Sequence, residues 1–257
     1  MAKRILIVLC LTSVAGILTA ADNPFIGTWK LNPAKSKFTG ESMSFEKTAD
    51  GMRFSAAGES YALKMDGADT AALFGYTAAW KQVSDHGWET ANKLNGKLLS
   101  TDYLTLSGDG KTLTIVSKGT KPDGTPFADT TVHQRESGKE GLAGKWRNKG
   151  VKISSPNTIQ CGALDGEGLT CKSPDYGSSW GGRFDEKDFA VTGPTVPPGA
   201  TGTMKRLGPR SIEMTEKING KAIFRMTWTV SADGKTMTST GSPVAVNEPT
   251  TAVFDRQ

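Results

Sequence analysis

The chain has 257 residues, of which 37% are hydrophobic and 22% charged, and its 31 basic and 26 acidic residues give a formal net charge of +5. This composition is typical of a folded globular protein and excludes collagen-like, intrinsically disordered and multi-spanning membrane proteins. The small basic excess is not gathered into a cluster, so nucleic acid is not expected as a partner.

The first segment, residues 1–21, is predicted to be a secretory signal peptide. Lys3 and Arg4 precede an uncharged apolar run over residues 5–18, and small residues follow up to Ala21. The run is too short and wrongly flanked for a transmembrane anchor, so cleavage is expected after Ala21. Loss of the two basic residues lowers the net charge to +3. We therefore expect a secreted or periplasmic protein whose mature chain has no membrane span.

The rest of the chain is predicted to be a tandem duplication. Short motifs recur in the same order and at similar spacing, so residues 22–137 and 141–257 are assigned to two related domains joined at Ser137–Glu140. The matching segments are Gly27-Thr-Trp-Lys30 with Gly144-Lys-Trp-Arg147, Lys93-Leu-Asn-Gly-Lys97 with Lys217-Ile-Asn-Gly-Lys221, Gly108–Thr114 with Ala232–Thr238, and Val132-His-Gln-Arg135 with Val253-Phe-Asp-Arg256.

Each repeat is predicted to consist of short antiparallel strands. Large apolar residues alternate with mostly polar ones over 222–230, and Asp-Gly pairs supply tight turns. Because so many short strands must pair or close to hide their edges, we predict an all-β fold of two up-and-down barrels, closed or partly open. The strands predicted in the first repeat are 25–31, 42–47, 52–56, 61–64, 76–83, 88–93, 98–106, 112–117 and 130–134.

Two cysteines of the second repeat are predicted to form a disulfide. Cys161 and Cys171 flank a glycine-rich segment, and closing so small a loop stabilises a protein by roughly 2–3 kcal/mol in the chain-entropy model. Neither the cysteine spacing nor the histidine content fits a zinc site. The acidic pair Asp66 and Asp69 is interpreted as solvated turn residues. No metal site is assigned, and no cofactor is expected.

A Gly-x-Trp motif at the first strand and an arginine at the last strand of each repeat resemble the signature of the calycins, the superfamily of lipocalins and fatty-acid-binding proteins. The chain as a whole is similar to lipocalin-like secreted bacterial proteins of unassigned function. The resemblance implies that Trp29 pairs with Arg135 and Trp146 with Arg256 where each barrel closes. Such a cation–π contact contributes roughly 0.5–2 kcal/mol, depending on desolvation.

The resemblance also implies a function, because a small barrel can enclose one apolar ligand against alternate strand residues. Packed core is the competing interpretation for aromatic residues at strand spacing. The candidate ligand-binding aromatics are Phe54, Tyr61, Tyr76, Trp80, Trp88, Trp180, Phe189, Phe224 and Trp228.

Two polar residues stand at positions that are apolar in the other repeat. The repeat alignment matches Asp102 with Met226 and His133 with Phe254. A charge on the inner face of a barrel is costly unless it is paired, so Asp102 is predicted to anchor a ligand or to pair with a basic group. His133 lies on the same strand face as Arg135 and is predicted to point inward as well.

Enzyme classes receive little support, and no catalytic residue is assigned. The Gly177–Gly181 segment fits the Gly-x-Ser-x-Gly pattern, but Pro174 and the following glycines do not allow the helix that a hydrolase needs there. We therefore expect a secreted or periplasmic protein that binds a small apolar molecule. The alternatives are a protein- or glycan-binding envelope module with packed barrels, and an isomerase or cyclase that uses Asp102 or His133 in a cavity.

Overall fold

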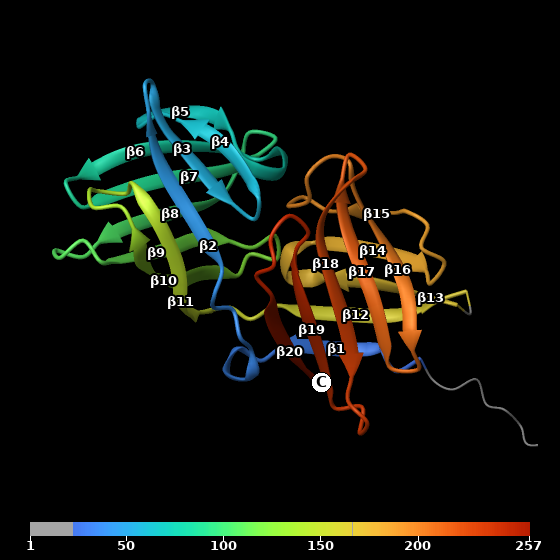
Figure 1. The fold of residues 1–257 in the computed structure, drawn as a ribbon. Helices are drawn as coiled ribbons and strands as arrows, with labels where there is room; N and C mark the ends of the chain where they lie inside the picture. Colours follow the sequence, from blue (N-terminus) through green and yellow to red (C-terminus); the bar gives the residue numbers. More distant parts are fainter. Residues whose placement is uncertain (1–22, 166) are drawn as a thin grey trace, which may run out of the picture.

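A computed structural model describes residues 23–165 and 167–257, so the predicted signal peptide lies outside the described residues. The fold is all-β and consists of two tandem antiparallel up-and-down barrels of ten strands each (Figure 1). In the part of the chain that is described, no helix is long and apolar enough to cross a bilayer. The predicted fold class is confirmed.

Barrel 1 comprises ten strands that are consecutive in sequence. Its ladder runs without interruption from β5 through β6 to β11 and on through β2 to β4, and the sheet stays unpaired between β4 and β5, so the barrel is nearly closed. The strands are β2 (Ser42–Thr48), β3 (Gly51–Ala56), β4 (Glu59–Leu63), β5 (Asp66–Ala71), β6 (Thr77–Ser84), β7 (Gly87–Leu94), β8 (Lys97–Leu106), β9 (Thr112–Thr120), β10 (Pro126–Ser137) and β11 (Gly144–Lys152).

Barrel 2 is closed and combines the first strand of the chain with the last nine. Its first strand, β1, pairs with β12 on one side and β20 on the other. The strands are β1 (Gly27–Leu31), β12 (Thr158–Leu164), β13 (Gly168–Ser173), β14 (Ser178–Arg183), β15 (Phe189–Thr192), β16 (Ala200–Gly208), β17 (Ser211–Ile218), β18 (Lys221–Val230), β19 (Thr236–Pro243) and β20 (Thr250–Arg256). Three short 3-10 helices, η1 (Pro33–Lys35), η2 (Leu73–Gly75) and η3 (Pro174–Tyr176), lie in connections.

The two repeats exchange their first strands. The Gly-x-Trp strand of the first repeat is β1, which belongs to barrel 2, whereas the equivalent strand of the second repeat is β11, which pairs with β10 and β2 in barrel 1. In Figure 1 the blue β1 accordingly lies among the yellow and red strands of the other barrel. The expectation that each contiguous repeat forms its own barrel is therefore corrected.

The exchange reverses the predicted pairing of the tryptophans with the arginines. The guanidinium carbon of Arg256 lies 4.1 Å from the ring centroid of Trp29, and that of Arg135 lies 4.1 Å from the centroid of Trp146. Both pairs are direct cross-strand neighbours. The predicted type of contact is present twice, but the predicted partners, Trp29 with Arg135 and Trp146 with Arg256, are wrong because each tryptophan strand joins the other barrel.

Each arginine also holds the chain segment that precedes its tryptophan. Arg256 donates from Nε to Gly234 O at 2.6 Å, from Nη1 to Ile26 O at 2.6 Å and from Nη2 to Pro24 O at 2.7 Å. Arg135 makes the same three bonds to carbonyl oxygens of barrel 1, each 2.6 Å long. Charge-assisted hydrogen bonds of this kind are stronger than neutral ones, so each arginine fixes the strand that closes its barrel.

The glycine of each Gly-x-Trp motif is required by the closing arginine. Gly27 and Gly144 have φ values of +136° and +139°, which L-residues with a side chain rarely adopt. A Cβ atom at Gly27 would also lie 2.5 Å from Arg256 Nη1, and one at Gly144 would lie 3.0 Å from Arg135 Nη1. The motif therefore combines a backbone requirement with a steric one.

The connection from β1 to β2 is fastened to β20 before it crosses to barrel 1. Asn32 Nδ2 donates to Asp255 Oδ2 at 2.6 Å, and Lys35 Nζ lies 2.8 Å from Asp255 Oδ1. Ser36 Oγ accepts a hydrogen bond from the backbone N–H of Val253 at 2.9 Å. The chain then reaches barrel 1 where Gly40 N donates to Asn148 O on β11.

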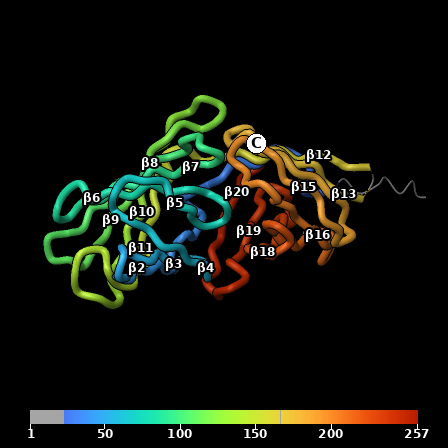
Figure 2. The backbone as a smooth tube through the Cα atoms, turned by 90° about the horizontal axis from the view of Figure 1, so that it is seen from above, coloured from blue at the N-terminus to red at the C-terminus, as the bar shows by residue number. Residues whose placement is uncertain are grey.

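The barrels lie side by side and make polar contacts with each other. Figure 2 shows β4 next to β18 and β19, where Lys221 forms an ion pair with Glu59. Near the centre, Lys121 is only 4% exposed, and its Nζ donates to Ser155 O at 2.6 Å and lies over the ring of Tyr176. Lys121 Nζ also lies 3.8 Å from Asp175 Oδ2, which supplies the opposite charge. A buried lysine paired in this way fixes the two barrels relative to each other.

The predicted strands of the first repeat are present, and one further strand, β5, was not predicted. Asp66 and Asp69, interpreted as turn residues, belong to β5, which pairs only with β6 and is mostly exposed. The predicted Cys161–Cys171 disulfide is confirmed, and it links directly opposed residues of β12 and β13.

Candidate ligand-binding site

Barrel 2 contains a cavity of about 460 Å³ between its strands and the neighbouring loops of barrel 1. This volume falls within the 300–1,000 Å³ typical of small-molecule sites. Its deeper wall is apolar because the inward residues of successive strands are aromatic or aliphatic. These include Ile159, Trp180, Phe189, Met214, Met226, Trp228 and Phe254.

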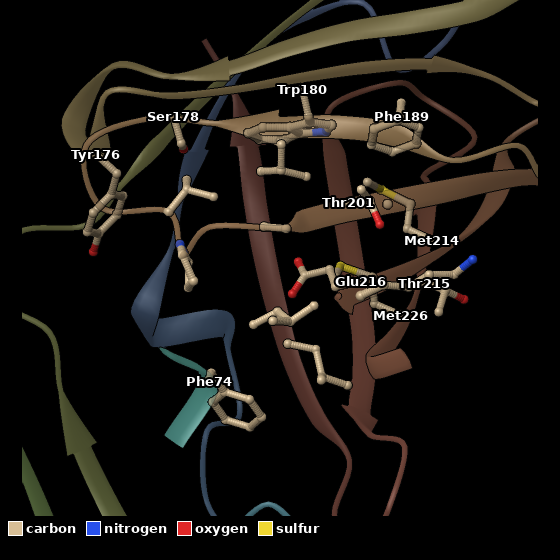
Figure 3. A pocket seen from close by; sticks show the side chains of 18 of the residues that line it. Phe74, Tyr176, Ser178, Trp180, Phe189, Thr201, Met214, Thr215, Glu216 and Met226 are labelled. Carbon is tan, nitrogen blue, oxygen red and sulfur yellow. The ribbon is translucent and has the colours of Figure 1, made fainter. Parts of the chain in front are cut away.

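Glu216 is the one carboxylate among the described residues that line the cavity. On β17 it continues the inward-facing positions of Ile212 and Met214, and it is paired across the sheet with Phe224. Figure 3 shows the carboxylate directed into the space between Trp180 and Phe74. Protein atoms surround Glu216 closely, and the resulting desolvation raises the pKa of its carboxyl group. The side chain nevertheless remains accessible to water, because it borders the cavity and not a packed interior.

Two further polar groups in the cavity wall are buried without a hydrogen-bond partner. These are Trp180 Nε1 and Thr201 Oγ1, for which residues 23–165 and 167–257 supply no partner atom. Leaving a buried donor unsatisfied costs about 1–3 kcal/mol.

Barrel 1 supplies the cover of this cavity. Phe74 and Tyr76, from the η2 connection, line its opening, and Tyr76 Oη donates to Thr195 O of barrel 2 at 3.0 Å. Phe74 has a φ of 59° and a ψ of 27°, the left-handed conformation that is uncommon for an aromatic residue. Figure 3 shows the Phe74 ring across the cavity from Trp180, with the Glu216 carboxylate between them.

A groove of about 740 Å³ adjoins the cavity between the two barrels. It shares Tyr76, Tyr176 and Thr195 with the cavity and is otherwise lined by barrel 1 residues at the ends of β8 and β9, together with the β9–β10 turn. Leu98 in this groove is 54% exposed. The groove therefore provides a partly apolar path from solvent to the opening.

Four of the five predicted aromatic residues of the first repeat, all except Tyr76, belong to the packed core of barrel 1 instead. Phe54, Tyr61 and Trp80 join Phe45 in one cluster whose ring centroids lie 5.0–6.4 Å apart. Trp80 Nε1 donates to Tyr61 Oη at 3.0 Å, and Trp88 is 4% exposed in the same core. Of the predicted aromatics, Tyr76, Trp180, Phe189 and Trp228 line the barrel 2 cavity, whereas Phe224 does not.

Asp102 lies on the inner face of barrel 1 and does not line the cavity of barrel 2. Asn92 Nδ2 donates to Asp102 Oδ2 at 2.8 Å, so among the described residues the partner of this carboxylate is an amide and not the predicted basic group. Burial raises the pKa of Asp102, an effect that hydrogen bonds from Ser117 and Asn92 oppose. The repeat alignment that matches Asp102 with Met226 also matches Asn92 with Glu216. Asp102 on β8 and Glu216 on β17 therefore do not occupy equivalent positions in the two repeats.

His133 points into barrel 1, as its strand face predicted, and is 8% exposed. Its Nε2 lies 2.9 Å from Thr131 Oγ1, and within the described part of the chain Nδ1 has no hydrogen-bond partner. Burial lowers the pKa of His133 to about 4, so the imidazole is neutral at physiological pH. It does not line the cavity of barrel 2.

Glu216, Thr201 and Phe74 are cavity residues that sequence reasoning missed. Glu216 could have been predicted from the sequence, because it follows Ile212 and Met214 at alternate positions of β17, which face the inside of the barrel. No sequence signal marks Phe74, because the contact arises only when barrel 1 meets barrel 2. Among the residues described, no group of three or more histidine, cysteine, aspartate or glutamate side chains is arranged to hold a metal ion. Comparison with known protein families, curated proteins and solved structures finds no match to this chain.

Proposed function

We propose that this protein reversibly binds a small, largely apolar molecule in the cavity of barrel 2. The observation that carries the proposal is the enclosed apolar wall of a 460 Å³ cavity with three unpaired polar groups, Glu216, Trp180 Nε1 and Thr201 Oγ1, in the described chain. Phe74 and Tyr76 of barrel 1 line the same cavity, so barrel 1 would shield part of a bound ligand from water. Barrel 1, whose own aromatic residues are packed, acts in this proposal as a supporting and covering domain.

The proposal includes export to a secreted or periplasmic location. The Cys161–Cys171 disulfide supports this, because disulfides persist mainly in oxidising compartments. The resemblance of both Trp–Arg closures to the calycin signature supports the binding role. Neither Asp102 nor His133 lines the cavity, so the isomerase or cyclase alternative gains no support. The alternative of an interaction module required packed barrels, and the cavity in barrel 2 favours ligand binding over it.

Tryptophan fluorescence tests this proposal, because Trp180 and Trp228 line the cavity whereas Trp80 and Trp88 belong to the core of barrel 1. A chain beginning at Asp22, the residue after the predicted cleavage point, is titrated with fatty acids, retinoids and bile-type amphiphiles. We expect a saturable change in tryptophan fluorescence with at least one of these ligand classes.

Matched variants locate the signal. Trp180→Phe should lose most of the ligand-induced change in fluorescence, while Trp88→Phe should retain it. Ala252→Phe, which fills part of the cavity without touching the opening, should weaken binding at least tenfold. A saturable signal that persists unchanged in Ala252→Phe and Trp180→Phe would place the ligand elsewhere, and the absence of any signal with all three classes would refute the proposal.

A further inference from the structure

We infer that the cavity of barrel 2 selects amphiphiles with a primary amine head group over amphiphiles of the same length with a carboxylate head group. This inference rests on the proposed function, because it concerns the chemistry of the ligand at the same site. It depends on where the charged groups stand along the cavity and on which of them are already engaged.

Glu216 lies on the side of the cavity that faces Phe74 and Tyr76 of barrel 1. It is close enough to Tyr76, at the opening, for its charge to contribute to the raised pKa of that phenol, after the larger effect of burial. The side chains farther along β17 and β18 from the opening, Met214, Met226 and Trp228, are apolar. An amphiphile would therefore insert its tail first and leave its head group beside Glu216.

The head group beside Glu216 meets a carboxylate that the described protein does not neutralise. No hydrogen bond or ion pair to Glu216 from another side chain is found within residues 23–165 and 167–257. Lys217 is the single basic residue in the described cavity lining, and its Nζ is held by Asp188 Oδ1 at 2.6 Å. An incoming ammonium group would gain a charge partner, whereas an incoming carboxylate would face a like charge.

The lysines of the adjoining groove do not reverse this preference. Lys121 Nζ donates to Ser155 O and faces Asp175, and Lys118 lies over the ring of Tyr103, 5.0 Å from its centroid. Lys97 is exposed to solvent, where salt screens its charge. Glu216 is therefore the charged group that decides the head-group preference inside the opening.

The remaining polar groups fit the same ligand. Thr201 Oγ1 is buried in the cavity wall, and a threonine hydroxyl is compatible with either head group. Trp180 Nε1 can only donate, and it would face an oxygen of the ligand where one is present. A dodecyl chain is short enough for a cavity of this volume, so amphiphiles with this chain test the head group alone.

The test compares dodecylamine, dodecanol and dodecanoate as competitors of the neutral dye Nile red, each below its micelle concentration and at pH 7. With the wild-type chain beginning at Asp22, we expect dodecylamine to bind at least tenfold more tightly than dodecanoate, with dodecanol between them. Glu216→Gln should bring the amine and the carboxylate to within about threefold and change dodecanol by less than about threefold, since one charge interaction of about 1.4 kcal/mol corresponds to tenfold.

Glu213→Gln is the matched control, because it removes the same charge from the outward face of β17. Glu213→Gln should retain the wild-type order of affinities, with dodecylamine the tightest and dodecanoate the weakest. Circular dichroism checks that both variants fold, which is expected because glutamine is nearly the same size as glutamate. Equal or reversed affinities in the wild type, or an unchanged amine-to-carboxylate ratio in Glu216→Gln, would overturn the inference while leaving ligand binding intact. Failure of all three amphiphiles to displace the dye would instead count against the proposed function.

Discussion

Trp29 lies against Arg256 and not against Arg135, the arginine at the end of its own repeat. Arg256 and Arg135 make equivalent contacts, so either barrel could in principle accept either tryptophan strand. The connection after β1 decides the outcome. Asp255, on β20, holds Asn32 and Lys35, whereas the equivalent residue beside Arg135 is the uncharged Gln134.

Engineered disulfides should show directly which barrel contains β1. Lys30 and Asp255 are paired across β1 and β20, so Lys30→Cys with Asp255→Cys should form an intramolecular cross-link under mild oxidation. Lys30→Cys with Gln134→Cys joins the equivalent positions of unexchanged barrels and should stay reduced. Peptide mapping by mass spectrometry distinguishes the two. Efficient cross-linking of the second pair would show that β1 remains with its own repeat.

A double-mutant cycle should find energetic coupling between Trp29 and Arg256. We expect about 1 kcal/mol from the cation–π contact when Trp29→Phe is combined with Arg256→Met, measured by urea unfolding. Trp29→Phe combined with Arg135→Met should show coupling near zero, because those residues belong to different barrels. Comparable coupling in both cycles would contradict the exchanged pairing.

His133 should make the protein less stable in mild acid. The pKa of an unfolded histidine is about 6.5, and that of His133 in the fold is about 4, so between these values the unfolded chain binds a proton that the folded chain does not. Stability is therefore lost as the pH falls from 6.5 to 4, by up to about 3 kcal/mol. His133→Phe, which introduces the residue found at this position in the second repeat, should reduce the difference in unfolding free energy between pH 7 and pH 4 by that amount.

Denaturant unfolding at several pH values measures this effect. His86→Gln, in an exposed turn, serves as the control and should keep the wild-type difference. A His133→Phe protein with an unchanged pH dependence would show that burial does not lower the pKa of His133 in the fold.

Phe74 should slow ligand release. Phe74→Gly and Phe74→Ala both remove the ring from the opening, so both should accelerate dissociation at least severalfold in stopped-flow fluorescence. Glycine adopts the left-handed backbone of this position without strain, so Phe74→Gly should be more stable than Phe74→Ala by about 1 kcal/mol. Unchanged dissociation rates in both variants would show that the ring does not control the opening.

The sequence was sufficient to predict the architecture but not the strand exchange. Period-two alternation and the recurring motifs predict two barrels, since both are local properties of the chain. The Gly-x-Trp motif cannot identify its barrel, because Gly27 and Gly144 meet equivalent arginines in the same geometry. β5 escaped prediction because Asp66–Ala71 is mostly exposed and paired on one side only, and therefore lacks an apolar face.

The candidate site could be predicted only in part. Trp180, Phe189 and Trp228 were identified because aromatic residues at inward strand positions face either a core or a cavity. Which of the two they face depends on how completely neighbouring side chains fill each barrel, and no single strand encodes that. Phe45, Phe54 and Trp80 fill barrel 1, whereas barrel 2 keeps a cavity that Phe74 closes from outside.

The pairing of β1 with β20 also sets the order in which the two barrels can be completed. All strands of barrel 1 lie between Ser42 and Lys152, so its ladder can form while the second half of the chain is still being synthesised. Barrel 2 needs Gly27–Leu31 and Thr250–Arg256 together, contacts of the greatest sequence separation in the fold and hence the slowest to form. The cavity of barrel 2 can therefore be completed only when the last strand of the chain is present, whereas barrel 1 can already be complete at that stage.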